Sequence, residues 1–314
     1  MATPEGHVLS ASPSVKGRLL RFVDNELWLG RTMIAPAIVY IVLLVGFPFF
    51  LALFYSLTNV TVGSQEMRFV GLEKFRHIVS NPTFWVALKN TFIFAFVSQI
   101  LVLILAKTLA LSLMKDFRGK WVVRLLILLP WVAAISLGSI GWLWIFDSIY
   151  SVINWTARAI GIFGPDTWPI WLGQPDLAMA SIITVHVWRL LPLATVIILA
   201  GLTSIPQDIL DAAAVDGAGF WRTLFQITLP LLMPILLVAL LFGIVFAFTD
   251  MTVVYVLTRG GPYDTTQVLA SLAYFTGIDG GDLAEGAAIS LFLFPLLAAV
   301  AVVFLRIARR TEVA

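Results

Sequence analysis

The stretch LLMPILLVALLFGIVFAFTDMTVVYVL, residues 231–257, decides the fold of this chain. Its only charged side chain is that of Asp250. A helix of about 20 residues crosses a bilayer core about 30 Å thick, because each residue advances the helix by about 1.5 Å. Lipid offers no partners for backbone N–H and C=O groups, so a segment in lipid must satisfy them within a helix. We therefore expect residues 231–257 to form a transmembrane helix.

Five other apolar stretches predict further transmembrane helices, about six in all: residues 32–57, 90–114, 125–146, 177–201 and 285–307. The whole chain is 60% hydrophobic and 12% charged, with a mean hydropathy of +0.97. Soluble domains carry about 25% charged residues. The first stretch is too long for the apolar part of a signal peptide and lacks a small-residue cleavage site, so we expect it to be retained. The composition predicts an all-α membrane protein.

The distribution of Lys and Arg predicts the orientation. The segments on the side of the two termini carry twelve of these residues, and those on the opposite side carry six. Cytoplasmic loops carry the excess of Lys and Arg. We expect a cytoplasmic segment at 1–31, a transmembrane domain at 32–310 and a cytoplasmic tail at 311–314. On the outer side, residues 58–89 should form a small cap and residues 147–162 a short interfacial amphipathic helix.

Several function classes are excluded by what the sequence lacks. It has no cysteine, so thiolate metal sites and disulfides are absent, and its three histidines lie too far apart in sequence to suggest metal ligands. The phosphate-binding pattern G-x-x-x-x-G-K-[ST] is missing, because Gly119-Lys120 is followed by Trp121 and lacks the upstream glycine. The net charge of +2 gives no reason to expect nucleic acid as a partner. We expect a protein that moves a solute and binds no cofactor itself.

One loop between predicted spans, residues 204–230, has an unusual composition. It reads SIPQDILDAAAVDGAGFWRTLFQITLP. Pro206 suits the first turn of a helix, and Asp208 favours its positive end. The alanines that follow extend the helix, and Gly217 permits a left-handed exit. We expect a helix–turn–helix whose second helix ends near Gln226, before Pro230 begins the next span.

The spacing of this loop resembles the permease subunits of binding-protein-dependent ABC importers. Their cytoplasmic EAA loop reads E-A-A, three residues, G, nine residues and I-x-L-P. The present chain gives Asp211-Ala212-Ala213, then Gly217, then Ile227-x-Leu229-Pro230, with Asp in place of Glu at the first position. The resemblance implies that Asp211, Ala212, Ala213, Asp216 and Gly217 couple the chain to an ATPase.

Further motifs extend the resemblance over nearly the whole chain and to the carbohydrate-uptake branch, which includes maltose and glycerol-3-phosphate permeases. They occur in the family's order: Ala35-Pro36, Gly71-Leu72 with Phe75, Leu88 with Asn90-Thr91, Leu129-Pro130-Trp131, Trp142 with Trp144 and Phe146, and Phe246 with Asp250 followed by Leu257-Thr258 and Gly260-Gly261-Pro262. The resemblance implies a MetI-like permease domain that forms half of a solute path in a bacterial inner membrane. It also implies a second homologous permease, ATP-binding cassette subunits that hold ATP and Mg²⁺, and an extracytoplasmic solute-binding protein. The solute is expected to be a sugar, an oligosaccharide or a polyol.

The candidate solute-path residues are Arg189, Trp144 and Asp250. Ionisable groups within membrane spans are costly and usually face a cavity or a partner. Arg189 belongs either to a structural ion pair or to the path, and Asp250 has either a structural role or a hydrogen bond to a sugar hydroxyl. Trp144, with its neighbouring aromatic residues, either packs at the membrane interface or stacks on a sugar ring. Lys107 lies near the cytoplasmic end of its span and can snorkel.

Two other classes compete with the importer. A stand-alone secondary transporter or channel predicts inverted repeats and intramembrane carboxylates, and the spans contain few carboxylates. A membrane-embedded enzyme or an anchor subunit predicts a catalytic constellation, which the sequence does not offer. Co-purification with an ATPase distinguishes the importer from both.

Overall fold

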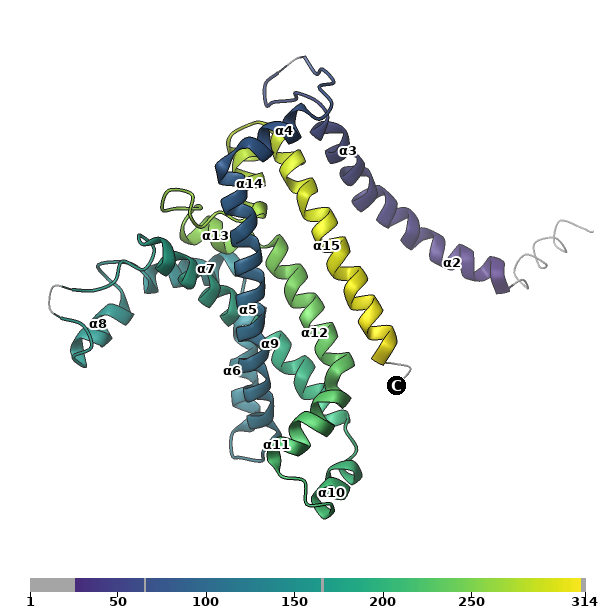
Figure 1. The fold of residues 1–314 in the computed structure, drawn as a ribbon, viewed down its shortest axis with the longest axis vertical. Coiled ribbons are helices and arrows are strands. Elements are labelled where there is room, and N and C mark those ends of the chain that lie inside the picture. The colour runs from purple at the N-terminus through teal and green to yellow at the C-terminus, as the bar shows by residue number, and fades with distance from the viewer. Residues whose placement is uncertain (1–25, 65, 165–166, 312–314) are drawn as a thin grey trace, which may run out of the picture. The chain divides into compact units, whose positions relative to one another are not determined.

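The computed structural model describes residues 26–64, 66–164 and 167–311, and these are almost entirely helical (Figure 1). Within them, five helices are long and apolar enough to cross a membrane, and a sixth crossing results if one bent pair of helices is a single span. The all-α membrane fold with about six transmembrane helices is therefore confirmed. Most of the expected cytoplasmic segment 1–31 and of the tail 311–314 lies outside the described residues.

The first span forms a unit by itself. It consists of α2 (Glu26–Ile41), a π-helical turn (Val42–Gly46) and α3 (Phe47–Ser56). Pro48 follows the π-helical turn and has no N–H to donate to the preceding turn. A π-helical turn is a common way for a helix to absorb such a gap. The span begins about four residues earlier than the sequence predicts, at Trp28.

The remaining helices form a bundle around a close pair, α5 (Pro82–Met114) and α9 (Pro175–Ser204). Alanines are fully or almost fully buried along both helices: Ala87, Ala95, Ala106 and Ala110 on α5, and Ala178 and Ala194 on α9. Small side chains let membrane helices approach closely, which strengthens van der Waals contact. Helix α12 (Leu229–Thr249) packs against both members of the pair.

The predicted span 125–146 contains a sharp bend that the sequence did not predict. The structure has α6 (Lys120–Val132) and α7 (Ile135–Ile145), which meet at an angle of 98°. The linking residues Ala133 and Ala134 are extended, with ψ angles of 141° and 124°. Pro130 supplies no backbone donor in the last turn of α6, which weakens that turn. Hydropathy could not reveal this bend, because both arms are equally apolar.

Both ends of the predicted span 231–257 also differ from the structure. Helix α12 ends at Thr249, because Asp250 is extended and its Oδ1 accepts the N–H groups of Thr252 (3.0 Å) and Val253 (3.4 Å), which opens α13 (Thr252–Leu257). At the other end, α11 (Phe220–Thr223) and a π-helical turn (Leu224–Thr228) run without a break into α12. The predicted separate helix ending near Gln226 is therefore wrong. The π-helical turn carries the chain through Pro230 into α12.

The 58–89 loop forms the predicted cap. Thr58 and Phe69 pair as an isolated β-bridge, followed by α4 (Glu73–Ser80). Nζ of Lys74 bonds to the carboxylate of Asp282 at 2.5 Å and lies 3.9 Å from that of Glu285. These acids lie at the start of α15 (Leu283–Thr311), which follows α14 (Leu269–Tyr274) and a π-helical turn (Phe275–Asp279). The ion pairs tie α4 to the outer end of α15.

The predicted helix at 147–162 is shorter in the structure, where α8 spans Val152–Ala159. Oδ1 of Asp147 accepts the N–H groups of Tyr150 (2.7 Å) and Ile149 (2.8 Å), so residues 147–150 form a turn. These two bonds hold the pKa of the Asp147 carboxyl below its ordinary value. Ser151 then caps α8, since its Oγ accepts the N–H of Asn154.

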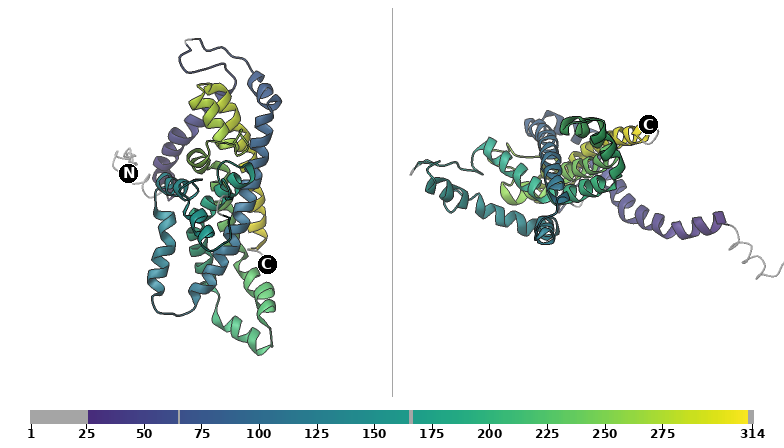
Figure 2. Two further views of the ribbon diagram at one scale, coloured as in Figure 1. Left: turned by 90° about the vertical axis from the view of Figure 1, so that its left-hand side faces the viewer. Right: turned by 90° about the horizontal axis from the view of Figure 1, so that it is seen from below.

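Several segments of the bundle lie at two opposite ends, and α8 projects from its side between them (Figures 1 and 2). The turn between α5 and α6 lies at the same end as α10 (Gln207–Val215) and α11. Helix α4, the 58–72 loop and α14 lie at the other end. The turn between α5 and α6 thus lies with the coupling loop, and α4 lies with α14, whereas α8 lies apart from α4 and α14.

Candidate functional site

The predicted coupling loop forms a sharp elbow between α10 and α11. Pro206 precedes the first residue of α10, Asp208 lies in its first turn, and Nε2 of Gln207 donates to Oδ1 of Asp211 at 2.9 Å. The helix ends at Gly217, whose φ of +71° is left-handed. The N–H of Gly217 bonds to the carbonyl of Ala214 (3.1 Å), and that of Ala218 bonds to the carbonyl of Ala213 (2.9 Å). Only glycine adopts such a conformation without steric cost.

Almost all of the elbow is exposed in this chain. Asp211, Ala212, Asp216 and Gly217 are exposed, and Ala213 is the one buried residue of α10. Val215 at the tip is 88% exposed. Beyond the elbow, the aromatic side chains of Phe220, Trp221 and Phe225 form a continuous contact series and are exposed as well. A helix with so little of its surface packed gains little stability from its own chain, which is typical of a docking element.

The elbow leads directly into the membrane bundle. Because α11, the π-helical turn and α12 are continuous, only the turn at residues 216–219 separates α10 from the helix that enters the bundle. Nζ of Lys107 on α5 lies 6.0 Å from the ring centroid of Phe225, within the range of a cation–π contact. Lys107 therefore links α5 to the base of the elbow.

A second site is a buried ionic cluster between α9 and the end of α12. Oδ2 of Asp250 lies 2.8 Å from Nδ1 of His186 and 3.4 Å from Nη1 of Arg189. The side chains of His186 and Asp250 are buried, whereas that of Arg189 is 23% exposed. Both carboxylate oxygens of Asp250 are hydrogen-bonded, so Asp250 holds the cluster together, and Arg189 is its most exposed member.

The structure brings Arg189 and Asp250 together but places Trp144 apart from them. Trp144 is 65% exposed on α7, whereas Trp142 packs against Trp188 and Phe146. Arg189 and Trp188 lie beside residues of the bend between α6 and α7, around a space too small to hold a water molecule. The bend therefore positions a wall beside Arg189.

Sequence reasoning missed His186 as the partner of Asp250. The signal was present, because positions 186 and 189 are three residues apart and share one face of a helix. It also missed the role of Asn90 and Thr91. Nδ2 of Asn90 donates to the carbonyls of Thr265 (2.7 Å) and Gln267 (3.0 Å), and Oγ1 of Thr91 accepts the N–H of Leu269 (2.8 Å). These bonds fasten the loop after Gly260-Gly261-Pro262 to α5.

No group of three or more His, Asp or Glu side chains that could hold a metal ion occurs within the described ranges. Residues 19–312 match the family described as binding-protein-dependent transport system inner membrane component. The chain belongs to this family. It is therefore a permease subunit of a binding-protein-dependent ABC importer, a pore component rather than an enzyme.

Curated relatives of this permease cover nearly its full length. It is 34% identical over 285 residues to the trehalose/maltose transport system permease protein MalF of Thermococcus litoralis, covering 91% of this chain and 95% of MalF. It is 31% identical over 311 residues to the sulfoquinovosyl glycerol transport system permease protein SmoG of Agrobacterium fabrum, covering 98% and 100% of the two chains. These relatives belong to sugar and sugar-glycoside importers, as the resemblance implies.

A solved structure has the same fold as this permease. The crystal structure of a bacterial alginate ABC transporter in complex with an alginate pentasaccharide-bound periplasmic protein contains a chain that matches with a TM-score of 0.78 and 21% identity. The match covers 93% of this chain and 98% of that chain. The described architecture is thus that of a known importer subunit.

Proposed function

We propose that this permease forms one half of the path for a carbohydrate and that the elbow at 204–230 docks on a separate ATPase, which holds ATP and Mg²⁺. A second homologous permease completes the path, and an extracytoplasmic binding protein delivers the solute. The observation that carries the proposal is the exposed elbow at Gly217, continuous with α12. Closure of the ATPase moves α10, and the continuous helix passes that movement into the bundle.

The proposed orientation has the α10 end of the bundle in the cytoplasm. Lys115, Arg118, Lys120, Arg124 and Arg222 all lie in segments at this end. Cytoplasmic loops are rich in such residues. Both termini are cytoplasmic in this orientation, and the cap at residues 58–89 faces the binding protein.

The proposed solute path runs beside Arg189. Asp250 positions the guanidinium, whose remaining N–H donors can reach sugar hydroxyls. The face of α7 that carries Leu137, Ile140 and Trp144 is exposed, and the second permease covers it in this arrangement. The sugar class is supported by the names of MalF and SmoG.

The test of orientation uses the absence of cysteine from the natural chain. Single-cysteine variants Val215→Cys and Leu72→Cys place an exposed thiol at each end of the bundle, since these side chains are 88% and 70% exposed. In intact cells, a membrane-impermeant maleimide is expected to label Leu72→Cys and to label Val215→Cys only after lysis. Labelling of Val215→Cys in intact cells overturns the orientation and with it the docking of a cytoplasmic ATPase.

The test of the partner is co-purification. A tagged form of the permease, expressed with its neighbouring subunits, is expected to retain an ATPase through detergent extraction. The solute class is tested by a thermal-shift panel on the binding protein that associates with the complex, with trehalose, maltose and glycerol phosphate as the first ligands. Absence of any ATPase from the complex contradicts the proposal.

A further inference from the structure

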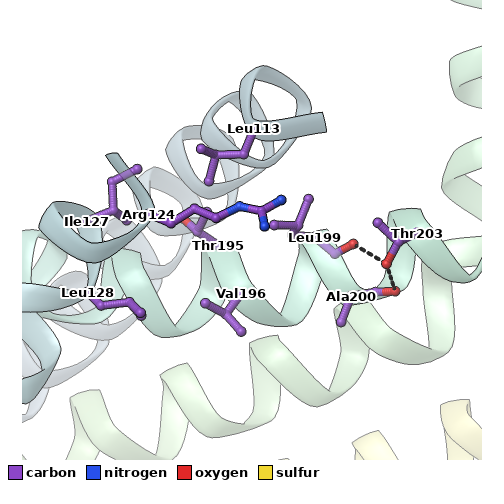
Figure 3. Close-up of a pocket in the computed structure, with 9 residues that line it drawn as sticks. All are labelled: Leu113, Arg124, Ile127, Leu128, Thr195, Val196, Leu199, Ala200 and Thr203. Atoms are coloured by element: carbon purple, nitrogen blue, oxygen red, sulfur yellow. Dashed lines mark hydrogen bonds between the residues drawn. The ribbon is translucent and has the colours of Figure 1, made fainter. Parts of the chain in front are cut away.

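Outside the elbow and the ionic cluster, a groove of about 390 Å³ lies between α5, α6 and α9 (Figure 3). Its volume lies within the range of ligand sites, roughly 300–1,000 Å³. The floor is formed by Leu113 and Thr195, which are almost fully buried. The rims carry exposed side chains, among them Val196 and Leu128, so the groove opens on the outer surface of the chain.

The lining has one cationic group, Arg124, and is otherwise almost wholly aliphatic. The threonine hydroxyls in the lining are internally bonded: Oγ1 of Thr195 donates to the carbonyl of Leu191, and Oγ1 of Thr203 donates to those of Leu199 and Ala200. Figure 3 shows Arg124 extending from α6 across the groove, with its guanidinium between Leu113 and Leu199. Within the part of the chain that the structure describes, no carboxylate forms an ion pair with Arg124.

Arg124 is exposed and gives the groove a cationic group that can bind an anion. The guanidinium stays charged at every physiological pH, and its planar donors match a phosphate bidentately. The arginine lies one turn into α6, close to the end of the bundle that carries Lys115 and Arg118. In the proposed orientation this is the cytoplasmic leaflet, where anionic lipids concentrate and where basic pockets between transmembrane helices bind phospholipid head groups.

The groove also has the polarity gradient of a phospholipid. From Thr203 to Thr195 it follows α9 for eight residues, or about 12 Å along the helix axis. Arg124 reaches into the groove toward Leu199. Ile127, Leu128 and Val196 line the part of the groove that lies farther from the α10 end of the bundle. A charged head group at Arg124 and an acyl chain along α9 satisfy both parts together. A polar metabolite leaves the aliphatic part unsatisfied, and a neutral alkyl chain leaves Arg124 unpaired.

We propose that this groove binds one anionic phospholipid of the cytoplasmic leaflet, with its phosphate on Arg124 and one acyl chain against Leu113, Ile127 and Val196. The assignment rests on the orientation proposed above. The lipid fills the space between α6 and α9 and thereby supports α6. The bend that follows α6 lies beside Arg189.

The test measures the lipid that the assembled transporter retains. The complex is purified from nanodiscs of phosphatidylcholine containing phosphatidylglycerol, and native mass spectrometry counts the phosphatidylglycerol bound per copy of this chain. We expect about one molecule with the wild-type chain. Arg124→Gln should raise roughly fivefold the phosphatidylglycerol content needed for half occupancy, because a cation near the membrane surface contributes about that factor to the affinity for an anionic lipid. Arg118→Gln, which removes an equal charge from the adjoining loop outside the groove, should leave it unchanged.

A second pair of variants tests the acyl part. Ala200→Phe fills the groove and should displace the lipid while Arg124 remains. Leu126→Phe introduces the same side chain at a residue of α6 that does not line the groove and should have no effect. Glycerol phosphate without acyl chains should fail to compete at concentrations at which phosphatidylglycerol binds. Effective competition by glycerol phosphate identifies a site for the free anion and overturns the lipid assignment.

Three further outcomes also overturn it. In the first, the wild-type chain and Arg124→Gln retain equal amounts of phosphatidylglycerol. In the second, the wild-type chain retains phosphatidylcholine and phosphatidylglycerol equally. In the third, Ala200→Cys forms a cross-link to a second permease within the complex. Retention of the ATPase is scored in the same spectra. A complex that keeps its ATPase but loses no lipid in Arg124→Gln refutes the groove alone, whereas a chain without ATPase refutes the proposed function.

Discussion

The elbow at Gly217 allows a sharp test, because the chain provides its own control two residues away. A Cβ added at Gly217 or at Gly219 meets no atom within 4 Å, so packing does not distinguish the two positions. Their backbones differ. Gly217 has a φ of +71°, whereas Gly219 has φ −69° and ψ 166°, a conformation that any residue adopts. The substitutions Gly217→Ala and Gly219→Ala therefore differ only in backbone strain.

The size of the effect follows from this strain. The left-handed conformation costs a residue with a Cβ about 1–2 kcal/mol, so Gly217→Ala lowers the equilibrium ratio of the bent to the unbent elbow by about 5- to 30-fold, which is the upper bound for the fall in the bent population. If only the bent form docks, the apparent dissociation constant of the ATPase rises by the same factor. Gly219→Ala should change it by less than about twofold. Gly217→Asn should fall between them, since asparagine tolerates left-handed backbone better than alanine does.

The assay is a titration of the purified ATPase against the permease in nanodiscs, followed by fluorescence anisotropy of a labelled ATPase. The thermal midpoint of each variant is measured in parallel, and we expect it to move little because α10 is largely exposed. Equal dissociation constants for Gly217→Ala and Gly219→Ala refute the reasoning. In that case the bend is either unnecessary for docking or formed equally well without glycine.

Three further predictions concern the bundle. Asp250→Ala removes the partner of His186 and Arg189. It should lower the free energy of unfolding by about 3–5 kcal/mol, because the loss of one member of a buried ion pair leaves the other charge unpaired. An unchanged thermal midpoint in detergent contradicts the structural role of Asp250. Asn90→Ala removes two hydrogen bonds to the 265–267 backbone and should speed amide hydrogen exchange at residues 258–269, and an identical exchange map argues against the anchor. Gly286→Ala would place a Cβ against the backbone of Gly277 and Ala273 and should destabilise the protein by about 1–3 kcal/mol. Its control, Gly141→Ala, lies in open space on α7 and should be neutral or stabilising by up to about 1 kcal/mol. If Gly286→Ala has the higher thermal midpoint of the two, the close approach of the two backbones is refuted.

The sequence predicts those parts of the fold that are determined by hydropathy and local backbone chemistry. The positions of the apolar spans follow from the cost of placing polar groups in lipid, and the elbow follows from the glycine at position 217. The 98° bend after Val132 was missed, because two apolar arms and one long span have the same composition. The continuity of α11 with α12 was missed because a proline was interpreted as a break, although a π-helical turn absorbs it.

The site was predicted in part for the same physical reasons. Charged residues in apolar spans stand out, so Arg189 and Asp250 were found without the structure, but their contact joins residues 61 apart in sequence and depends on how α9 meets α12. The groove at Arg124 was not predicted. It depends on the separation of three helices, which no local pattern records.

Photo-cross-linking at the tip of the elbow tests the central claim most directly. A benzophenone amino acid replaces Val215, the most exposed apolar side chain of α10, and in a second variant it replaces Leu72 at the opposite end of the bundle. After irradiation of intact membranes that contain the complete transporter, we predict an adduct with the ATPase from position 215 and none from position 72. An adduct from position 72 alone, or no ATPase adduct from position 215 in a complex that transports its solute, contradicts the claim that this elbow links the motor to the membrane helices.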